Sequence, residues 1–95
     1  MTRPPNIVFI GKKPILTYVN ATLTLLANEP TVIIKARGNS ITAAVDVSQM
    51  IVKRMNAVGY KVSAVRIFSE RMESKDGKER NVSTIEVDVS RSQND

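Results

Sequence analysis

A chain of 95 residues with 42% hydrophobic content is long enough for one small folded domain with a single core. It contains no cysteine and no histidine, so it lacks a thiol nucleophile and the most common general base and metal ligand. No apolar run approaches the roughly 20 residues of a membrane-spanning helix, and no signal-peptide pattern is present. The composition therefore predicts an intracellular binding protein that needs no membrane, metal or cofactor.

The net charge of +5 and the pI near 9.9 predict a polyanionic partner. Residues 1–54 hold seven Lys and Arg but only two Asp and Glu, whereas residues 55–95 hold seven of each. The positive excess is thus concentrated in the first half of the chain, as a polyanion-binding surface requires.

The first candidate site follows the first predicted strand. Residues 1–5 are expected to be loose, and the apolar run at residues 6–10 predicts a short buried strand. Gly11-Lys12-Lys13-Pro14 then forms a strand-to-helix turn, with Pro14 expected at the first helical position. The backbone N–H groups that follow are expected to remain free, and with the two lysines they would bind a phosphate.

A helix is predicted from about Pro14 to Asn28, where Pro30 favours its end. Its apolar stripe has helical spacing and consists of Ile15, Val19, Leu23 and Leu26.

The clearest strand runs from Thr31 to Gly38, and its alternation sends Val32, Ile34 and Ala36 to one face and Ile33, Lys35 and Arg37 to the other. Arg37 ends this strand just before a second helix. In a parallel pair of strands joined by a helix, the two following turns lie at the same edge of the sheet. Lys12, Lys13 and Arg37 are therefore expected to be neighbours.

The second helix is predicted from Ser40 to Met55, with Asn39 or Ser40 as its N-terminal cap. Its apolar face is expected to comprise Ile41, Ala44, Val45, Ile51, Val52 and Met55. Gly59 is expected to allow the chain to reverse after this helix.

Two long strands, from Tyr60 to Ser74 and from Lys78 to Arg91, flank Lys75-Asp76-Gly77 and predict a β-hairpin. Near its base, the predicted inward-facing residues are Val62, Ala64 and Phe68 on one strand and Ile85, Val87 and Val89 on the other. From about residue 69 to residue 82 charged side chains predominate, so this part is expected to project from the body as an arm.

A two-residue turn at Asp76-Gly77 would set the register of the arm. It would place Lys75 opposite Lys78 and Glu73 opposite Arg80, so that one face would be basic. That face would contain Arg71, Glu73, Lys75, Lys78 and Arg80. A longer loop would change the register and mix the two faces.

The predicted order is β-α-β-α-β-β in one domain over residues 1–95, which indicates an α/β protein built as an α+β two-layer sandwich with one helical layer. Val65 and Ile67 are expected to leave apolar surface that a second subunit would cover. Arg66 lies on the same strand and needs a carboxylate or carbonyl partner, for which the dimer interface is one place.

Several of these segments together resemble the Alba family of archaeal chromatin proteins. They are Asn6-Ile-Val-Phe-Ile-Gly-Lys-Lys-Pro14, Ile34-Lys-Ala-Arg-Gly38 with the following Ile41 and Ala44-Val-Asp46, and Val82-Ser-Thr-Ile-Glu86. The resemblance implies a fold like that of the C-terminal domain of bacterial translation initiation factor three. It also implies a cytoplasmic, chromosome-associated homodimer that binds double-stranded DNA with little sequence preference, and often RNA.

The resemblance also assigns roles to residues. It implies phosphate contacts by Lys12, Lys13 and Arg37, and an arm at about Arg71 to Arg80 that reaches toward the minor groove. Asn39 stands where many relatives have a further arginine, and Met55 is the nearest match to an apolar residue through which dimers associate side by side. Lys12 and Lys13 are candidate acetylation sites. The candidate nucleic-acid contacts are thus Lys12, Lys13, Arg37, Asn39, Arg71, Lys75, Lys78 and Arg80.

The residues bear on three candidate functions. A chromatin protein that compacts duplex DNA is favoured, because the four aromatic residues Phe9, Tyr18, Tyr60 and Phe68 are expected mostly in core-like positions rather than on a base-stacking platform. The alternative within the same class is an RNA-binding subunit of a ribonucleoprotein. A nucleic-acid-processing enzyme is disfavoured, since Asp46 and Glu86 have no second carboxylate at a spacing that fits paired metal ions.

Overall fold

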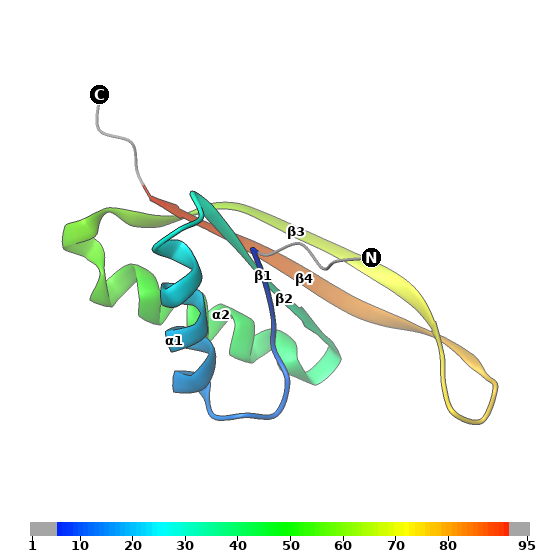
Figure 1. The fold of residues 1–95 in the computed structure, drawn as a ribbon. Coiled ribbons are helices and arrows are strands. Elements are labelled where there is room, and N and C mark those ends of the chain that lie inside the picture. The colour runs from blue at the N-terminus through cyan, green and yellow to red at the C-terminus, as the bar shows by residue number, and fades with distance from the viewer. Residues whose placement is uncertain (1–5, 92–95) are drawn as a thin grey trace.

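The computed structural model describes residues 6–91 and shows a four-stranded sheet with both helices on one of its faces (Figure 1). The elements in chain order are β1 (Ile7–Phe9), α1 (Ile15–Leu26), β2 (Thr31–Arg37), the 3₁₀ turn η1 (Gly38–Ser40), α2 (Ile41–Arg54), the 3₁₀ turn η2 (Asn56–Val58), β3 (Tyr60–Glu73) and β4 (Glu79–Arg91). The predicted α+β architecture and element order are confirmed. The prediction of a loose N-terminus at residues 1–5 falls outside the described residues.

The strand order across the sheet is β1-β2-β4-β3, with β1 parallel to β2 and the other neighbours antiparallel. On β2 the predicted alternation is confirmed: Val32, Ile34 and Ala36 are buried under the helices. They pair with Val89, Val87 and Ile85 of β4, which are buried as well. These two strands therefore supply the floor of the core. We call the other side of the sheet, which the helices do not cover, the open face.

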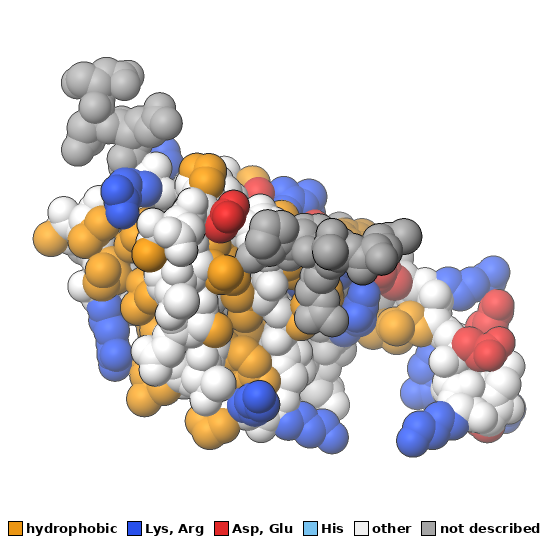
Figure 2. Space-filling view, viewed as in Figure 1, with side chains coloured by type: hydrophobic (Ala, Val, Ile, Leu, Met, Phe, Trp, Pro, Cys, Tyr) orange, Lys and Arg blue, Asp and Glu red, His pale blue; other side chains and the backbone are white. Residues whose placement is uncertain are grey.

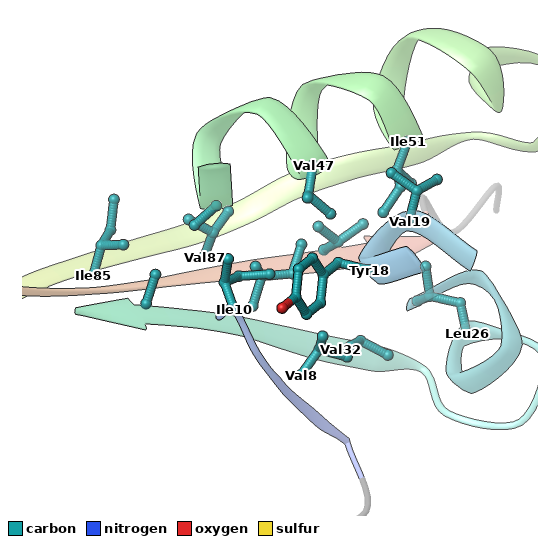
Figure 3. Packing of buried hydrophobic residues seen from close by; sticks show 14 of the residues in the cluster. Val8, Ile10, Tyr18, Val19, Leu26, Val32, Val47, Ile51, Ile85 and Val87 are labelled. Carbon is teal, nitrogen blue, oxygen red and sulfur yellow. The ribbon is translucent and has the colours of Figure 1, made fainter. Parts of the chain in front are cut away.

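The two helices cover this core on the side of the sheet opposite the open face (Figure 3). The predicted stripe of α1 is confirmed at Val19 and Leu26, which are buried, and the stripe also includes Tyr18 and Thr22. On α2 the buried residues are Ala44, Val47, Ser48 and Ile51. The assignment of Val45 to the apolar face was wrong, because the sheet lies against the neighbouring stripe of α2 and leaves Val45 exposed.

The start of α2 also differs from the prediction. Ser40 occupies the N-terminal cap position, but no side-chain hydrogen bond caps this helix. A capping side chain needs an extended backbone at the cap residue, whereas Ser40 has helical angles because it is the last residue of the turn η1. Gly38 begins that turn with a φ of 55°, a conformation that glycine adopts without strain.

A β-bulge changes which side chains of β3 face the core. The register shifts between Val62 and Ala64, so Val62 still pairs with Val89, but the alternation of all later residues is inverted. The prediction that Ala64 and Phe68 face inward was wrong: they pair with Asp88 and Thr84, on the open face. In their place, Val65 pairs with Val87 and Ile67 pairs with Ile85.

The turn at the tip of the hairpin is longer than predicted. The N–H of Ser74 donates to the carbonyl of Lys78 (2.8 Å) and that of Gly77 to the carbonyl of Ser74 (3.0 Å). With Gly77 at a φ of 83°, this is a three-residue loop with a type I turn and a glycine bulge. The two-residue turn was therefore wrong, and the register of the arm moves by one residue.

The arm, residues 69–82, extends beyond the ends of both helices and gives the molecule its length (Figure 1). The overall dimensions are 51 × 27 × 22 Å. Within the described part of the chain, no helix is long and apolar enough to cross a membrane.

Replacing Ile51 with Ala is expected to lower the free energy of unfolding by about 2–5 kcal/mol, because the fully buried side chain would leave a cavity between α2 and the sheet. Leu16→Ala is the matched control, since Leu16 is 50% exposed, and is expected to change stability by about 0.5 kcal/mol or less. Equilibrium urea denaturation measures both. Equal losses would contradict the packing of α2.

Candidate nucleic-acid interface

In the turn between β1 and α1 both predicted lysines are exposed, and the backbone of the turn is hydrogen-bonded to a buried tyrosine. Lys12 and Lys13 are exposed, whereas Tyr18 is buried in the first turn of α1. The Tyr18 hydroxyl accepts hydrogen bonds from the N–H groups of Gly11 (2.9 Å) and Lys13 (3.0 Å). A Cβ on residue 11 would lie 3.1 Å from this hydroxyl, so glycine suits the position.

The N–H groups predicted to stay free are those after Pro14, and the prediction was wrong for Thr17, whose N–H donates to the carbonyl of Pro14 (3.0 Å). The position of Pro14 was also one residue off, because it precedes the helix as its cap residue. The lysine side chains nevertheless lie on a turn whose backbone is held rigidly, which lowers the entropy lost when they bind a ligand.

The parallel pairing of β1 and β2 brings the two basic segments to one edge of the sheet. Phe9 pairs with Lys35, and the N–H of Ile10 donates to the carbonyl of Lys35 (2.9 Å). The Lys12-Lys13 turn and Arg37 both follow directly after this last contact. The structure thus places their backbones at the same edge, as predicted.

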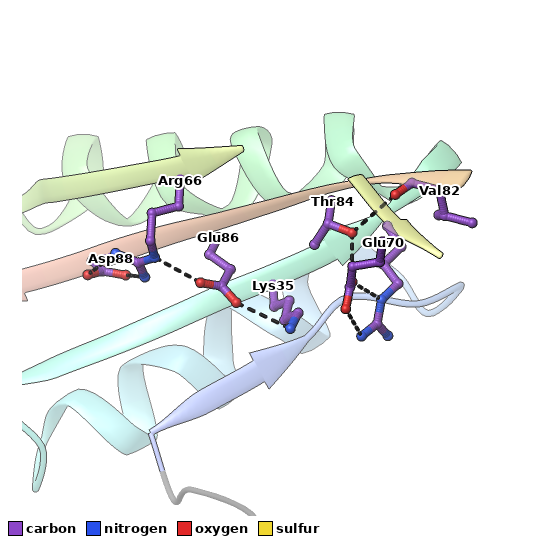
Figure 4. A network of polar contacts seen from close by, with 8 residues as sticks. Lys35, Arg66, Glu70, Val82, Thr84, Glu86 and Asp88 are labelled. Carbon is purple, nitrogen blue, oxygen red and sulfur yellow. Dashed lines mark hydrogen bonds and ion pairs between the residues drawn. The ribbon is translucent and has the colours of Figure 1, made fainter. Parts of the chain in front are cut away.

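The side chain of Arg37, however, has a partner that the sequence analysis missed. Its Nε donates to Glu70 Oε1 at 2.7 Å, and Nη2 lies 3.5 Å from Oε2. The hydroxyl of Thr84 donates to the same Oε1 at 2.8 Å (Figure 4). The hydrogen bond from Arg37, supported by that from Thr84, lowers the pKa of Glu70 to about 2, and the Glu70 carboxylate in turn raises the pKa of Arg37.

A second polar network covers the open face beside this pair. Arg66 donates from Nε to Glu86 at 2.8 Å and from Nη1 to Asp88 at 3.1 Å, and Lys35 Nζ lies 3.2 Å from Glu86 (Figure 4). These hydrogen bonds, with Asp88 first and Glu86 second, raise the pKa of Arg66. Arg66 therefore has its carboxylate partners within its own chain, and the expectation that it would pair across an interface is unnecessary.

The aromatic residues are divided between the core and the open face. Tyr18 and Tyr60 are buried, as predicted, but Phe9 and Phe68 are 38% and 39% exposed. Both phenyl rings lie about Lys35, whose Nζ is 6.0 Å from the ring centre of Phe9 and 5.8 Å from that of Phe68. The core-like position predicted for Phe68 was wrong because the bulge in β3 turns it outward.

The basic residues of the arm are exposed, but they do not share one face (Figure 2). Arg71 pairs with Asn81, whereas Arg80 pairs with Met72 on the opposite face. The predicted face of net charge +3 was therefore wrong, since it depended on the shorter turn.

The carboxylate of Asp76 stabilises the turn at the tip of the arm. Asp76 accepts hydrogen bonds from the hydroxyl of Ser74 and from the N–H of Lys78 (3.1 Å), and these bonds lower its pKa. The turn thus keeps Lys75 and Lys78 exposed at the end of the arm.

The two remaining predicted contacts are at opposite ends of α2. Asn39 is exposed in the turn η1, next to Arg37. Met55 follows the last residue of α2 and is half-buried against the core, beside the exposed Val58. Asn39 therefore lies at the basic edge, while Met55 does not.

An apolar patch lies where β3 passes the start of α2. Val65 and Ile67 are 54% and 77% exposed although they are on the helix-covered face, because β3 is the edge strand. Val45 of α2 is exposed as well, and Ile41, Ile67 and Ile85 line a shallow groove there. We call Ile41, Val45, Val65 and Ile67 the apolar patch.

The sequence analysis missed Tyr18, Glu70 and Thr84 as parts of the site. A signal existed for Tyr18, since a tyrosine beside the buried stripe of a helix needs a partner for its hydroxyl. For Glu70 and Thr84 there was none, because their contacts depend on the register of β3 and β4.

Removing the hydroxyl in Tyr18→Phe is expected to cost about 1–3 kcal/mol of stability, because the N–H groups of Gly11 and Lys13 lose their acceptor. Amide hydrogen exchange at these two positions is expected to accelerate. Tyr60→Phe is the control, since within residues 6–91 the Tyr60 hydroxyl accepts one hydrogen bond of 3.3 Å, from Arg91. Unchanged exchange in Tyr18→Phe would contradict the role of the hydroxyl in fixing the turn.

Known proteins show the same fold and sequence pattern. Residues 6–69 match the family model described as Alba. The chain is 52% identical over 92 residues to the DNA/RNA-binding protein Alba of Nitrosopumilus maritimus, covering 97% of each chain. It is 40% identical over 84 residues to the protein of the same name from Methanococcus maripaludis, covering 86% of this chain and 93% of that one.

Two solved structures agree with this relationship. Alba from Thermoplasma volcanium superposes with a TM-score of 0.82 at 39% identity, covering 90% of this chain and all of that one. The crystal structure of ALBA1 from Trypanosoma brucei gives a TM-score of 0.70 at 28% identity, covering 97% of this chain and 74% of that one. In sequence and in fold, this chain belongs to the Alba family.

Proposed function

We propose that this protein is a non-enzymatic chromatin protein that binds double-stranded DNA through its phosphate backbone, with little sequence preference, and compacts it in the cytoplasm. The observation that carries the proposal is the exposed Lys12-Lys13 turn, fixed by Tyr18 at the edge of the sheet where β2 ends in Arg37. Lysines, arginines and backbone N–H groups are the usual partners of phosphate. The names of the two curated relatives also support nucleic-acid binding.

The arm fits a groove rather than a single strand of the backbone. It carries Arg71 on one face, Arg80 on the other, and Lys75 and Lys78 at its tip. A narrow hairpin with cations on both faces is suited to lie between two rows of phosphates, as in the minor groove of DNA. The one-residue change of register thus favours insertion over lateral contact.

RNA is a second candidate ligand, and one observation favours it. Phe9 and Phe68 expose part of their rings on the open face, close to Lys35. Aromatic rings beside a cation can stack on unpaired bases, which is how proteins commonly recognise single-stranded RNA. A subunit of a ribonucleoprotein would use this face in addition to the basic edge.

The double variant Lys12→Gln, Lys13→Gln is expected to bind a DNA duplex about tenfold more weakly or worse, because each lost charge removes a phosphate contact and its counterion release. Since glutamine resembles acetyl-lysine in charge, acetylation of Lys12 or Lys13 is expected to weaken binding for the same reason. Affinity is measured against salt on random-sequence DNA and RNA duplexes. If each subunit contacts three or four phosphates, the wild-type dimer is expected to show a log–log slope of roughly −5 to −7.

The matched control for this experiment is Lys53→Gln, Lys61→Gln, which removes the same charge at the opposite end of the molecule. Lys53 lies in the last turn of α2, and Lys61 pairs with Ser90 at the end of the sheet far from Arg37. Equal effects of the two double variants would show that only total charge matters. An unchanged affinity in Lys12→Gln, Lys13→Gln would place the binding surface elsewhere.

Replacing the four basic arm residues by Ala is expected to weaken DNA binding while leaving the melting temperature nearly unchanged. These residues, which are exposed and outside the core, are Arg71, Lys75, Lys78 and Arg80. Calorimetry and a binding titration measure the two effects. A sharp fall in melting temperature would show that the arm is packed in solution rather than projecting.

The protein is also proposed to form a homodimer through the apolar patch, and dimers to associate along DNA near Met55. Sedimentation equilibrium at tens of micromolar is expected to give a dimer for the wild type and a monomer for Ile67→Asp, because a buried carboxylate has no partner there. Leu16→Asp, at an exposed position of α1, is the control and should remain dimeric. A monomeric wild type would rule out this interface.

A further inference from the structure

We propose that Glu70 competes with nucleic-acid phosphate for Arg37, so that this carboxylate at the root of the arm restrains binding and is displaced when nucleic acid binds. The inference rests on the proposed function but adds a residue and a step that neither the sequence pattern nor the relatives indicate. It predicts that removing an interaction of the folded protein strengthens ligand binding.

The geometry of the Arg37–Glu70 pair is that of a phosphate contact. Glu70 presents both carboxylate oxygens to the guanidinium of Arg37, with Oε1 2.7 Å from Nε and Oε2 3.5 Å from Nη2. Arginine binds the oxygens of a phosphate in the same side-on way. The carboxylate therefore occupies one edge of the guanidinium, formed by Nε and Nη2, and a phosphate cannot bind that edge side-on at the same time.

Glu70 is held in place for this contact with Arg37. It projects from β3, an edge strand, onto the open face, where the hydroxyl of Thr84 donates to its Oε1 at 2.8 Å. Thr84 is buried and pairs directly with Arg37 across β2 and β4. The same strand pairing thus fixes the arginine and the hydroxyl that orients its competitor.

A phosphate can replace the Glu70 carboxylate at Arg37, because the pair is accessible. The side chains of Arg37 and Glu70 are 36% and 29% exposed, so solvent and a phosphate can reach the pair. Ion pairs at this level of exposure are weak because water screens them. A phosphate that also contacts Lys12 or Lys13 at the same edge has further partners with which to displace the carboxylate.

Displacement would leave Glu70 as an unpaired negative charge beside the bound phosphate. The repulsion between the Glu70 carboxylate and the phosphate lowers the affinity for nucleic acid further. Neutralising Glu70 removes this repulsion. Glu70 lies at the junction between the body and the arm, residues 69–82, so its release also removes a contact that ties the arm to the end of β2. Glu70 is therefore expected to lower the affinity of the protein for nucleic acid.

The test compares Glu70→Gln with Glu73→Gln on one DNA duplex. Both substitutions remove one negative charge from β3, but Glu73 has no ion pair among residues 6–91. Glu70→Gln is expected to bind about threefold to tenfold tighter than the wild type, with a salt slope steeper by about one per subunit as Arg37 gains a phosphate. Glu73→Gln also removes a repulsive charge from the arm, but it is expected to tighten binding by a smaller factor than Glu70→Gln, since it frees no arginine for a phosphate.

Thr84→Val adds a variant in which no charge changes. It removes the hydroxyl that orients Glu70 and is expected to tighten binding in the same direction by a smaller factor. The NMR signal of Arg37 Nε–H is expected to differ between the wild type and Glu70→Gln, and in the wild type it is expected to shift on titration with the duplex. Melting curves confirm that each variant is folded.

Equal affinities of Glu70→Gln and Glu73→Gln, or weaker binding by Glu70→Gln than by the wild type, would overturn the inference. The latter result would mean that Glu70 aims the arm instead of restraining it. If wild-type protein binds no nucleic acid at all, the proposed function fails and this inference fails with it. Binding by the wild type with no specific effect at Glu70 would leave the proposed function intact.

Discussion

The antiparallel pairing of β2 with β4 is the interaction on which the rest of the structure depends. Seven consecutive residue pairs join the two strands, from Thr31 with Ser90 to Arg37 with Thr84. Because side chains alternate along each strand, this one register decides both faces of the sheet. In each of the two strands, every second residue lies under the helices and forms the floor of the core. The residues between them form the polar network of the open face. A shift by one residue would place Ile34 opposite Glu86 on the same face, so that either a charged residue would be buried or an apolar one exposed.

The bulge in β3 is the second constraint, and it acts on function more than on stability. By adding one residue before Ala64, it sends Arg66, Phe68 and Glu70 to the open face, toward β2. Val65 and Ile67 then point to the helix-covered side, where they exceed what α2 can cover. A single extra residue thus produces the Arg37–Glu70 contact, the exposed position of the Phe68 ring and the apolar patch.

The fold was predictable from the sequence because short-range patterns determine it. The alternation in β2, the helical periodicity of α1 and the Asp76-Gly77 turn signal gave the element order and the predicted parallel relationship of β1 and β2. The hairpin register was not predictable, since a two-residue and a three-residue turn both fit Lys75-Asp76-Gly77 and no residue marks the bulge. The same limit applied to the candidate site: Lys12 and Lys13 depend only on a local turn, whereas the partner of Arg37 depends on two registers at once.

The distribution of ion pairs explains why the charge count of each half of the chain is a poor guide to binding. The second half is neutral by count, but its carboxylates are used locally: Glu86 and Asp88 hold Arg66, Glu79 lies 3.4 Å from Arg71, and Glu70 holds Arg37 of the first half. Among the residues that the structure describes, no carboxylate pairs with Lys12 and Lys13 at the turn, or with Lys75, Lys78 and Arg80 near the tip. A cation whose partner is already fixed must exchange one anion for another, whereas an unpaired lysine releases only mobile counterions. Binding of a polyanion is therefore most favourable at the exposed turn and at the tip of the arm. At Arg37, which lies between them, the Glu70 carboxylate opposes binding.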